Sequence, residues 1–458
     1  MLRAGFGTYN ITPRVGVELY GFGPYQNRKS VGIHDLLEAR VGAFEAGGRK
    51  VVMITCDLCN LKDTAVETIR SVICAKRPEL QPADIMVACS HTHSGPSTDT
   101  ADHGWGAMDP TWYSILPYKI AEAVYLALDN MTEVKVSQAL VPCRHIGLNR
   151  VYDKDGPPLA DVLKEDWEPA KPECTDTECR VIRFDTAAGN KLIGFMAYFG
   201  CHPVCCCDDN HYITGDYPGV AMHNLMREFP GSVGMFLQGA EGDVNSGCVY
   251  KKEQESLLAL DVFAARFANA IRNGLNQAKE IPVDSIQTVS RTFRFKTRNV
   301  FTPERIEQVR RDQSAILLRA DADETSWNVR SAACYLRGLA KIEQLMKQED
   351  NDLRAEMQLI RMGDLEFIGA PFEIMQAIKN EVHAKSAARY PMLMSLVNGA
   401  NGYAPDNQSL SSTKLRGDYA AYAAITAPLV SGRLPYGDIH NELVKYSLEL
   451  EREADKQK

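Results

Sequence analysis

Strand-forming and helix-forming runs alternate along most of this chain, and this alternation constrains its fold more than any other feature of the sequence. Residues 39–45 and 50–56 are apolar runs of the strand type, and the turn signal Gly47-Gly48 joins them into a hairpin. A second hairpin is expected about Gly363-Asp364. The alternation predicts an α/β protein with mixed α+β elements and a central, largely buried sheet.

The remaining elements follow from hydrophobic periodicity and helix-start signals. Thr64-x-x-Glu67 has the pattern of a capping box that opens a helix, and Pro218 is expected to begin another. Further strands are predicted at residues 84–88, 134–141, 179–185, 191–198, 233–237, 287–295, 357–361 and 365–368. Further helices are predicted at residues 111–128, 256–277, 302–318, 330–347 and 441–455.

Composition excludes several classes of protein. The 458 residues carry a net charge of −8 without a run of basic residues, so we expect no nucleic-acid partner. The most apolar stretch, residues 192–207, is shorter than the roughly 18 residues a membrane helix needs, so no stable membrane insertion is expected. Thirteen cysteines, an odd number, follow a start that lacks a secretion signal, which predicts a cytoplasmic protein with free thiols. We expect residues 1–458 to form one large catalytic body, with a motif-rich first half, 1–285, and a second half, 286–458.

Chemically capable residues gather where predicted strands end. Five strand ends enter polar loops, most of them rich in glycine, which begin at Cys89, Gly200, Gln238, Gly369 and Asn398. Because the carboxyl edge of such a sheet is where α/β proteins place their sites, we expect these five loops to meet.

Two of these loops carry histidines that could bind a metal. His91 and His93 are two residues apart, so in an extended chain both imidazoles would point to one face, one binding a metal and the other moving protons. Both could equally be exposed loop residues. His202 lies beside Pro203 after an apolar strand, so it could be a metal ligand or a hydrogen-bonded core residue. Two imidazoles and the Glu373 carboxylate would form a nitrogen and oxygen site suited to zinc.

The loops resemble the neutral/alkaline non-lysosomal ceramidase family, a group of zinc amidases. The most specific piece is the heptapeptide from Ser90 to Pro96, Ser-His-Thr-His-Ser-Gly-Pro. Other segments similar to the family's, in the same order, are Ile11-Thr12-Pro13, Gly21-Phe22-Gly23, Gly32-Ile33-His34-Asp35, Asn149-Arg150, Cys201-His202-Pro203, Gly215-Asp216, Gly239-Ala240-Glu241-Gly242-Asp243-Val244, Pro371-Phe372-Glu373 and Asn401-Gly402-Tyr403. The resemblance spans residues 4 to about 404.

This resemblance implies a function and a set of site residues. It implies a metal-dependent hydrolase in which zinc is bound by His91, His202, Glu373 and Tyr403. It further implies that His93 acts as acid and base, and that Arg150 holds the substrate or its developing oxyanion. The chemistry agrees, because zinc lowers the pKa of bound water to about 7 and polarises a carbonyl. Tyr419 is taken as a further tyrosine of the active site.

Two departures from the family bear on the nucleophile and the substrate. Asn245 stands where ceramidases have a serine, and the serine here, Ser246, comes one residue later, so we expect metal-activated water rather than a serine nucleophile. Ceramidases also carry an immunoglobulin-like domain after the catalytic part, which we do not expect in this chain. We therefore predict cleavage of the amide bond of a small soluble N-acyl compound.

Several alternatives remain. The same site could act on an ester, a glycoside-type bond or ceramide, or the chain could be a non-catalytic protein that keeps the metal pocket, for which Asn245 is the suggestive feature. The three cysteines at 205–207 are expected to pack within a loop rather than to bind a metal, because consecutive residues cannot all direct their sulfur atoms at one ion. Cys56 and Cys59 have redox spacing but lack a thioredoxin context. Asp57 between them could assist the site or cap a helix.

Overall fold

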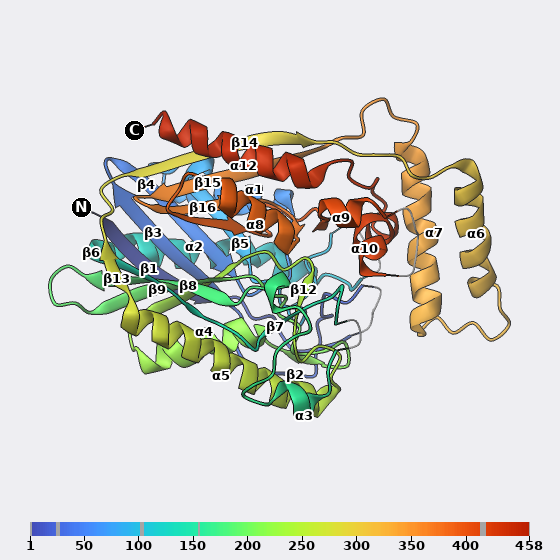
Figure 1. Cartoon of the computed structure of the whole chain (residues 1–458), viewed down its shortest axis with the longest axis horizontal. Coiled ribbons are helices and arrows are strands. Elements are labelled where there is room, and N and C mark those ends of the chain that lie inside the picture. The colour runs from blue at the N-terminus through green and yellow to red at the C-terminus, as the bar shows by residue number, and fades with distance from the viewer. Residues whose placement is uncertain (1, 24–27, 101–104, 154–155, 413–417, 458) are drawn as a thin grey trace.

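The fold is described by a computed structural model, in which residues 2–23, 28–100, 105–153, 156–412 and 418–457 are placed (Figure 1). The strands are β1 (Arg3–Asn10), β2 (Gly32–Ile33), β3 (Glu38–Ala46), β4 (Arg49–Cys56), β5 (Ile85–Cys89), β6 (Thr132–Pro142), β7 (Gly147–Asn149), β8 (Glu178–Thr186), β9 (Leu192–Phe199), β10 (Tyr212–Ile213), β11 (Val233–Gln238), β12 (Val244–Ser246), β13 (Lys279–Ile281), β14 (Ile286–Phe295), β15 (Leu353–Met362), β16 (Leu365–Gly369), β17 (Glu373–Ile374), β18 (Tyr390–Met394) and β19 (Tyr403–Ala404). The helices are α1 (Asp63–Lys76), α2 (Pro110–Asp129), α3 (Leu159–Val162), α4 (Asp216–Glu228), α5 (Glu253–Gln277), α6 (Pro303–Leu317), α7 (Trp327–Leu345), α8 (Gln376–Lys385), α9 (Asn407–Leu410), α10 (Tyr419–Ala421), α11 (Ala427–Val430) and α12 (Ile439–Asp455).

The largest sheet bends back on itself. Its main path runs β11-β9-β8-β6-β1-β3-β4-β5 within the described chain, and β1 and β6 share only the pairs Arg3↔Glu133 and Ala4↔Thr132. The two halves of the sheet therefore turn their inner faces toward one another. Phe6 of β1 packs against Phe184 of β8 with ring centroids 5.2 Å apart.

A second sheet closes the core from another side. It has the order β14-β15-β16-β18, and a bridge between Ala88 and Val397 joins its end to β5 of the first sheet. Apolar side chains of both sheets, many of them methionines, form one common cluster. Each outer sheet surface has its own helices: α1 and α2 beside β3–β5, α4 and α5 beside β8–β11, and α8 and α12 over the second sheet (Figure 1). Burying both faces of these strands explains their long apolar runs.

The close approach of α2 to β1 depends on a glycine. A Cβ on Gly5 would lie 2.0 Å from the backbone oxygen of Ala127, so helix or strand would have to move. We expect Gly5→Ala to destabilise the protein by about 1 to 3 kcal/mol, the usual cost of overpacking. Chemical denaturation measures this change. At Gly437 a Cβ would meet its nearest atom at 3.5 Å, so Gly437→Ala should cost much less; equal losses in the two variants would contradict the packing argument.

Most predicted elements are confirmed, as is the fold class. The hairpin about Gly47-Gly48 forms with Ala46 opposite Arg49, and β15 and β16 pair about Gly363. The predicted central sheet is the nine-stranded one, and the described residues also form a four-stranded sheet and three two-stranded sheets that were not expected. The capping box at Thr64 is wrong: α1 begins at Asp63, and its N-cap residue Lys62 makes no side-chain cap.

Two physical expectations concern membranes and thiols. No helix in the described ranges combines the length and apolar character needed to cross a bilayer. None of the thirteen cysteines, all of which lie within the described ranges, forms a disulfide, and the triplet 205–207 is buried in loop packing. Asp57 is buried and pairs with buried Arg40, with Oδ2 2.5 Å from Nη1.

Candidate active site

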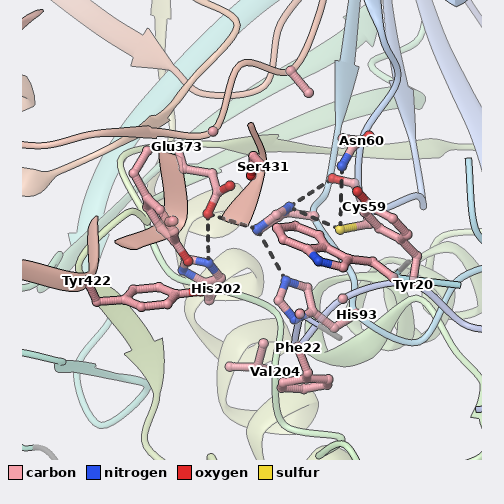
Figure 2. A pocket seen from close by; sticks show the side chains of 18 of the residues that line it. Tyr20, Phe22, Cys59, Asn60, His93, His202, Val204, Glu373, Tyr422 and Ser431 are labelled. Atoms are coloured by element: carbon pink, nitrogen blue, oxygen red, sulfur yellow. Dashed lines mark hydrogen bonds and ion pairs between the residues drawn. The ribbon is translucent and has the colours of Figure 1, made fainter. Parts of the chain in front are cut away.

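Three strand-end loops place the expected ligand atoms of His91, His202 and Glu373 together. One ligand atom from each residue lies within 4.8 Å of the other two. Glu373 Oε2 is 3.6 Å from His91 Nε2 and 3.5 Å from His202 Nε2. Figure 2 shows Glu373 and His202 pointing to the centre that His93 and Cys59 approach from the other side.

The backbone at His91 differs from the expected extended segment. His91 has φ 71°, a left-handed conformation that non-glycine residues adopt at a cost. Its amide donates to Leu58 O at 2.9 Å, and its Nδ1 lies 2.8 Å from Cys59 O. These bonds turn the ring so that Nε2 faces the site. The prediction that the chain is extended at His91 was therefore wrong. The two imidazoles nevertheless meet, because His93 Nε2 lies 3.3 Å from His91 Nε2.

His202 is fixed in the same way. Its Nδ1 lies 2.6 Å from Glu241 O and 3.2 Å from Val244 O, so Nδ1 carries the proton and Nε2 is left with a free lone pair. Nε2 is buried and has no hydrogen-bond partner in the described part of the chain. Burial lowers the pKa of His202 to about 4, which keeps the ring neutral, as a metal ligand must be.

Glu373 and Tyr403 are brought together by strand pairing. They are direct partners in the parallel pair β17 and β19, so their side chains enter the site side by side. Burial would raise the pKa of Glu373, but the nearby imidazoles of His202 and His91 outweigh it and hold this pKa well below its usual value. Burial raises the pKa of Tyr403 well above its usual value.

Arg150 reaches the site from the end of β7. Its Nη1 donates to Tyr403 Oη at 3.1 Å and to Tyr419 Oη at 2.9 Å. The Tyr419 hydroxyl in turn donates to Gly242 O. Among the described residues that line the cavity, Tyr422 is present and Tyr419 is not, so Tyr419 lies behind Arg150 and supports it.

His93 is held by glycine and aromatic contacts. A Cβ on Gly21 would lie 2.5 Å from His93 Cγ, so only glycine lets the 21–23 segment lie on this ring. The Phe22 ring meets His93 edge to face at 4.7 Å. Burial, and then the neighbouring imidazoles of His91 and His202, lower the pKa of His93 well below its usual value. A neutral imidazole beside His91 can accept a proton.

The two residues at the family's serine position face different ways. His202 bridges Asn245 in parallel pairing, and Asn245 lines the cavity. Ser246 is fully buried in β12 and is not among the described lining residues. This alternation is that of a strand.

The site opens into a cavity of about 670 Å³. This volume lies within the range of small-molecule sites. Its aromatic and apolar lining includes Tyr20, Phe22, Trp105, Val204, Val249, Trp327 and Tyr422. Sequence reasoning missed Cys59 and Lys62, which also line it. Both follow β4, the parallel neighbour of β5, and this strand end was a signal that could have identified them.

Comparison with known proteins identifies the family of this chain. The sequence profile of the family described as "Neutral/alkaline non-lysosomal ceramidase, N-terminal" matches residues 2–256. The chain belongs to the neutral/alkaline non-lysosomal ceramidase family. It is accordingly a hydrolase of the amidase type.

Relatives of the chain extend the match over its whole length. The neutral ceramidase of Pseudomonas aeruginosa is 23% identical over 468 residues, which cover 92% of this chain and 68% of that protein. The crystal structure of neutral ceramidase from Pseudomonas aeruginosa superposes with a TM-score of 0.73 at 18% identity, over 99% of this chain and 75% of that one. A ceramidase complexed with C2 gives a TM-score of 0.74 at 18% identity, covering 100% and 75%. These two structures support the fold.

Proposed function

We propose that this ceramidase-family member is a zinc-dependent hydrolase that cleaves the amide bond of a small soluble N-acyl compound in the cytoplasm. The observation that carries the proposal is the convergence of His91 Nε2, His202 Nε2 and a Glu373 oxygen within 4.8 Å. Both Nδ1 atoms are already engaged by backbone carbonyls, which leaves the Nε2 lone pairs for a cation.

The residues fit a zinc ion. The buried Nε2 of His202 lacks a partner among the described residues, and leaving such a group unsatisfied costs about 1 to 3 kcal/mol. Two imidazoles and a carboxylate, with the Tyr403 phenol beside them, are the donors that zinc prefers. Zinc held by His91, His202, Glu373 and Tyr403 would supply a Lewis acid that polarises the amide carbonyl and lowers the pKa of water.

The chain's own residues supply the proton transfers and the oxyanion contact. His93 takes a proton from the attacking water and delivers it to the leaving nitrogen, so that water and amide yield a carboxylic acid and an amine. Arg150, held by Tyr403 and Tyr419, points its permanent charge at the oxygen on which negative charge develops. Glu373 and Tyr403 come from the second half of the chain and His91 and His202 from the first. We therefore propose that residues 1–458 form one catalytic domain.

Ser246→Ala should retain most of the activity, because Ser246 does not line the cavity and the adjacent Asn245 has no nucleophilic oxygen. Turnover of N-acyl amines by the variant, before and after chelation, measures this. Chelation should remove nearly all activity from both proteins. A covalent adduct on Ser246, or loss of turnover in Ser246→Ala with zinc still bound, would show that serine chemistry operates.

The substrate class is tested by a panel measured on the zinc-loaded protein. N-acyl amines and N-acyl amino acids of increasing chain length are compared with matched esters, glycosides and a ceramide. Highest kcat/KM on a short N-acyl compound supports the proposal. Ceramide as the best substrate is the second candidate, which family membership and the aromatic cavity lining favour. Zinc binding without turnover of any compound would indicate a binding protein.

A further inference from the structure

One wall of the cavity carries three basic side chains, Lys62, Lys341 and Arg433, which we call the cationic wall. They come from distant parts of the chain: Lys62 precedes α1, Lys341 lies on α7, and Arg433 follows α11. All three line the same cavity as the candidate metal ligands. The reaction steps proposed above use none of them.

Lys62 and Arg433 hold the segment that leads into Tyr403. Lys62 Nζ donates to Ala400 O at 3.0 Å. Arg433 Nη1 donates to Asn401 O and, at 2.9 Å, to Tyr436 Oη. A Cβ on Gly402 would lie 2.2 Å from Arg433 Nη2, so the guanidinium rests directly on the chain. Both cations are therefore fixed next to the reaction centre rather than free in solvent.

Carboxylates act on the cationic wall only at a distance: Asp99 and Glu373 influence Lys62 without a direct ion pair. Within the described ranges, no carboxylate forms an ion pair with Lys62, Lys341 or Arg433. The described lining has four basic side chains, the wall and Arg150, against two acidic ones, Asp208 and Glu373. Glu373 is already committed to the candidate metal site, which would add further positive charge.

Structural support alone does not explain these charges. Burial, and then the charge of Arg433, lower the pKa of Lys62, and the carboxylates of Asp99 and Glu373 raise it to a smaller extent. Like charges held close in a partly buried site repel, whereas a neutral glutamine could donate to the same carbonyl oxygens. Lys62 uses one of its three donors, and Arg433 Nη2 makes no hydrogen bond to another described residue.

We propose that the substrate carries an anionic group, a carboxylate or a phosphate, that binds against Lys62 and Arg433 while the scissile amide lies at His91 and His202. The guanidinium fork can hold two oxygens of such a group, and the ammonium can hold a third contact. This inference rests on the proposed function and sharpens it: the N-acyl substrate is an acid rather than an uncharged lipid amide.

The experiment measures binding of uncleavable ligands to the zinc-loaded protein by calorimetry. 4-Oxononanoate has the shape of N-hexanoylglycine with a methylene in place of the amide nitrogen, and 4-oxononanamide is its uncharged match. We expect the carboxylate to bind about tenfold or more tightly, since charge-assisted hydrogen bonds are the stronger ones. The corresponding phosphonate, 3-oxooctylphosphonate, shows which anion the wall prefers.

Variants distinguish an anion that binds to the cationic wall from an anion that binds directly to zinc. In Lys62→Met the preference for the carboxylate should fall at least about fivefold. Lys445→Met changes a lysine on α12 whose side chain is 66% exposed, and it should leave the preference intact. Equal binding of the carboxylate and the amide by the unaltered protein overturns the proposal, and so does a preference that survives in Lys62→Met. The first of these results needs no variant, so misfolding cannot obscure it.

Turnover distinguishes failure of this inference from failure of the proposed function. If N-hexanoylglycinamide is cleaved as well as N-hexanoylglycine, amide hydrolysis stands and the anionic subsite is overturned. If neither is cleaved but the carboxylate preference depends on Lys62, the anion subsite stands and amide hydrolysis is overturned.

Discussion

Replacing His202 with alanine should remove zinc from the protein and reduce turnover by about a thousandfold or more. The ring is buried, and its Nδ1 is tied to Glu241 O, so Nε2 is the atom that faces the site and alanine removes it. Metal activation contributes several kcal/mol to such reactions, and each 1.36 kcal/mol corresponds to a factor of ten in rate. Metal analysis of the purified variant and its kcat on the best N-acyl substrate measure both effects.

A matched histidine serves as the control for this experiment. His211 is not among the described residues that line the cavity, and His211→Ala should keep both zinc and turnover. Glu373→Gln should resemble His202→Ala, because Glu373 Oε2 lies close to both imidazoles. Full zinc content in His202→Ala would contradict the assignment of His202 as a ligand.

Replacing His93 with alanine should leave zinc bound and cut turnover by roughly a hundredfold or more, the usual contribution of a positioned acid or base. The Nε2 atoms of His93 and His91 are 3.3 Å apart. His93 is nevertheless not part of the candidate metal-binding group, which His91 forms with His202 and Glu373. Its effect should appear in kcat more than in KM, because the proton moves in the transition state.

The metal content of His93→Ala decides between two arrangements. Retained zinc with slow turnover supports an acid and base role. Loss of zinc would mean that His91 and His93 are both ligands, an arrangement compatible with the second group of Cys59, His91 and His93. Phe22→Leu provides a milder comparison: it removes the ring that packs on His93 and should lower kcat less.

The sequence alone determined the elements whose signals are local. Hairpins at Gly47-Gly48 and Gly363-Asp364 were predictable because turn residues and alternating apolar residues lie within a few positions of each other. Strand β1 and helix α8 were missed. Gly5 and Gly7 weaken the strand pattern of β1, and both are there because α2 approaches too closely for a side chain. That requirement comes from a helix more than 100 residues away.

The same division holds for the candidate site. The sequence indicated the strand-end loops. The resemblance to a known family then pointed to His91, His202, Glu373 and Tyr403 as ligands within or after these loops. Only the tertiary structure decided how these residues meet. The left-handed backbone at His91 and the pairing of Glu373 with Tyr403 cannot be predicted from the local hydrophobic periodicity of the sequence.

The cationic wall is the clearest case of a feature that only the tertiary structure decided. Lys62 and Arg433 are 371 positions apart and each looks like an ordinary surface residue in its own segment. Hydrophobic periodicity reports which face of an element is buried, but it does not report which distant element covers that face. Long-range packing of distant elements places both charges at one segment, Ala400 to Gly402, beside the site.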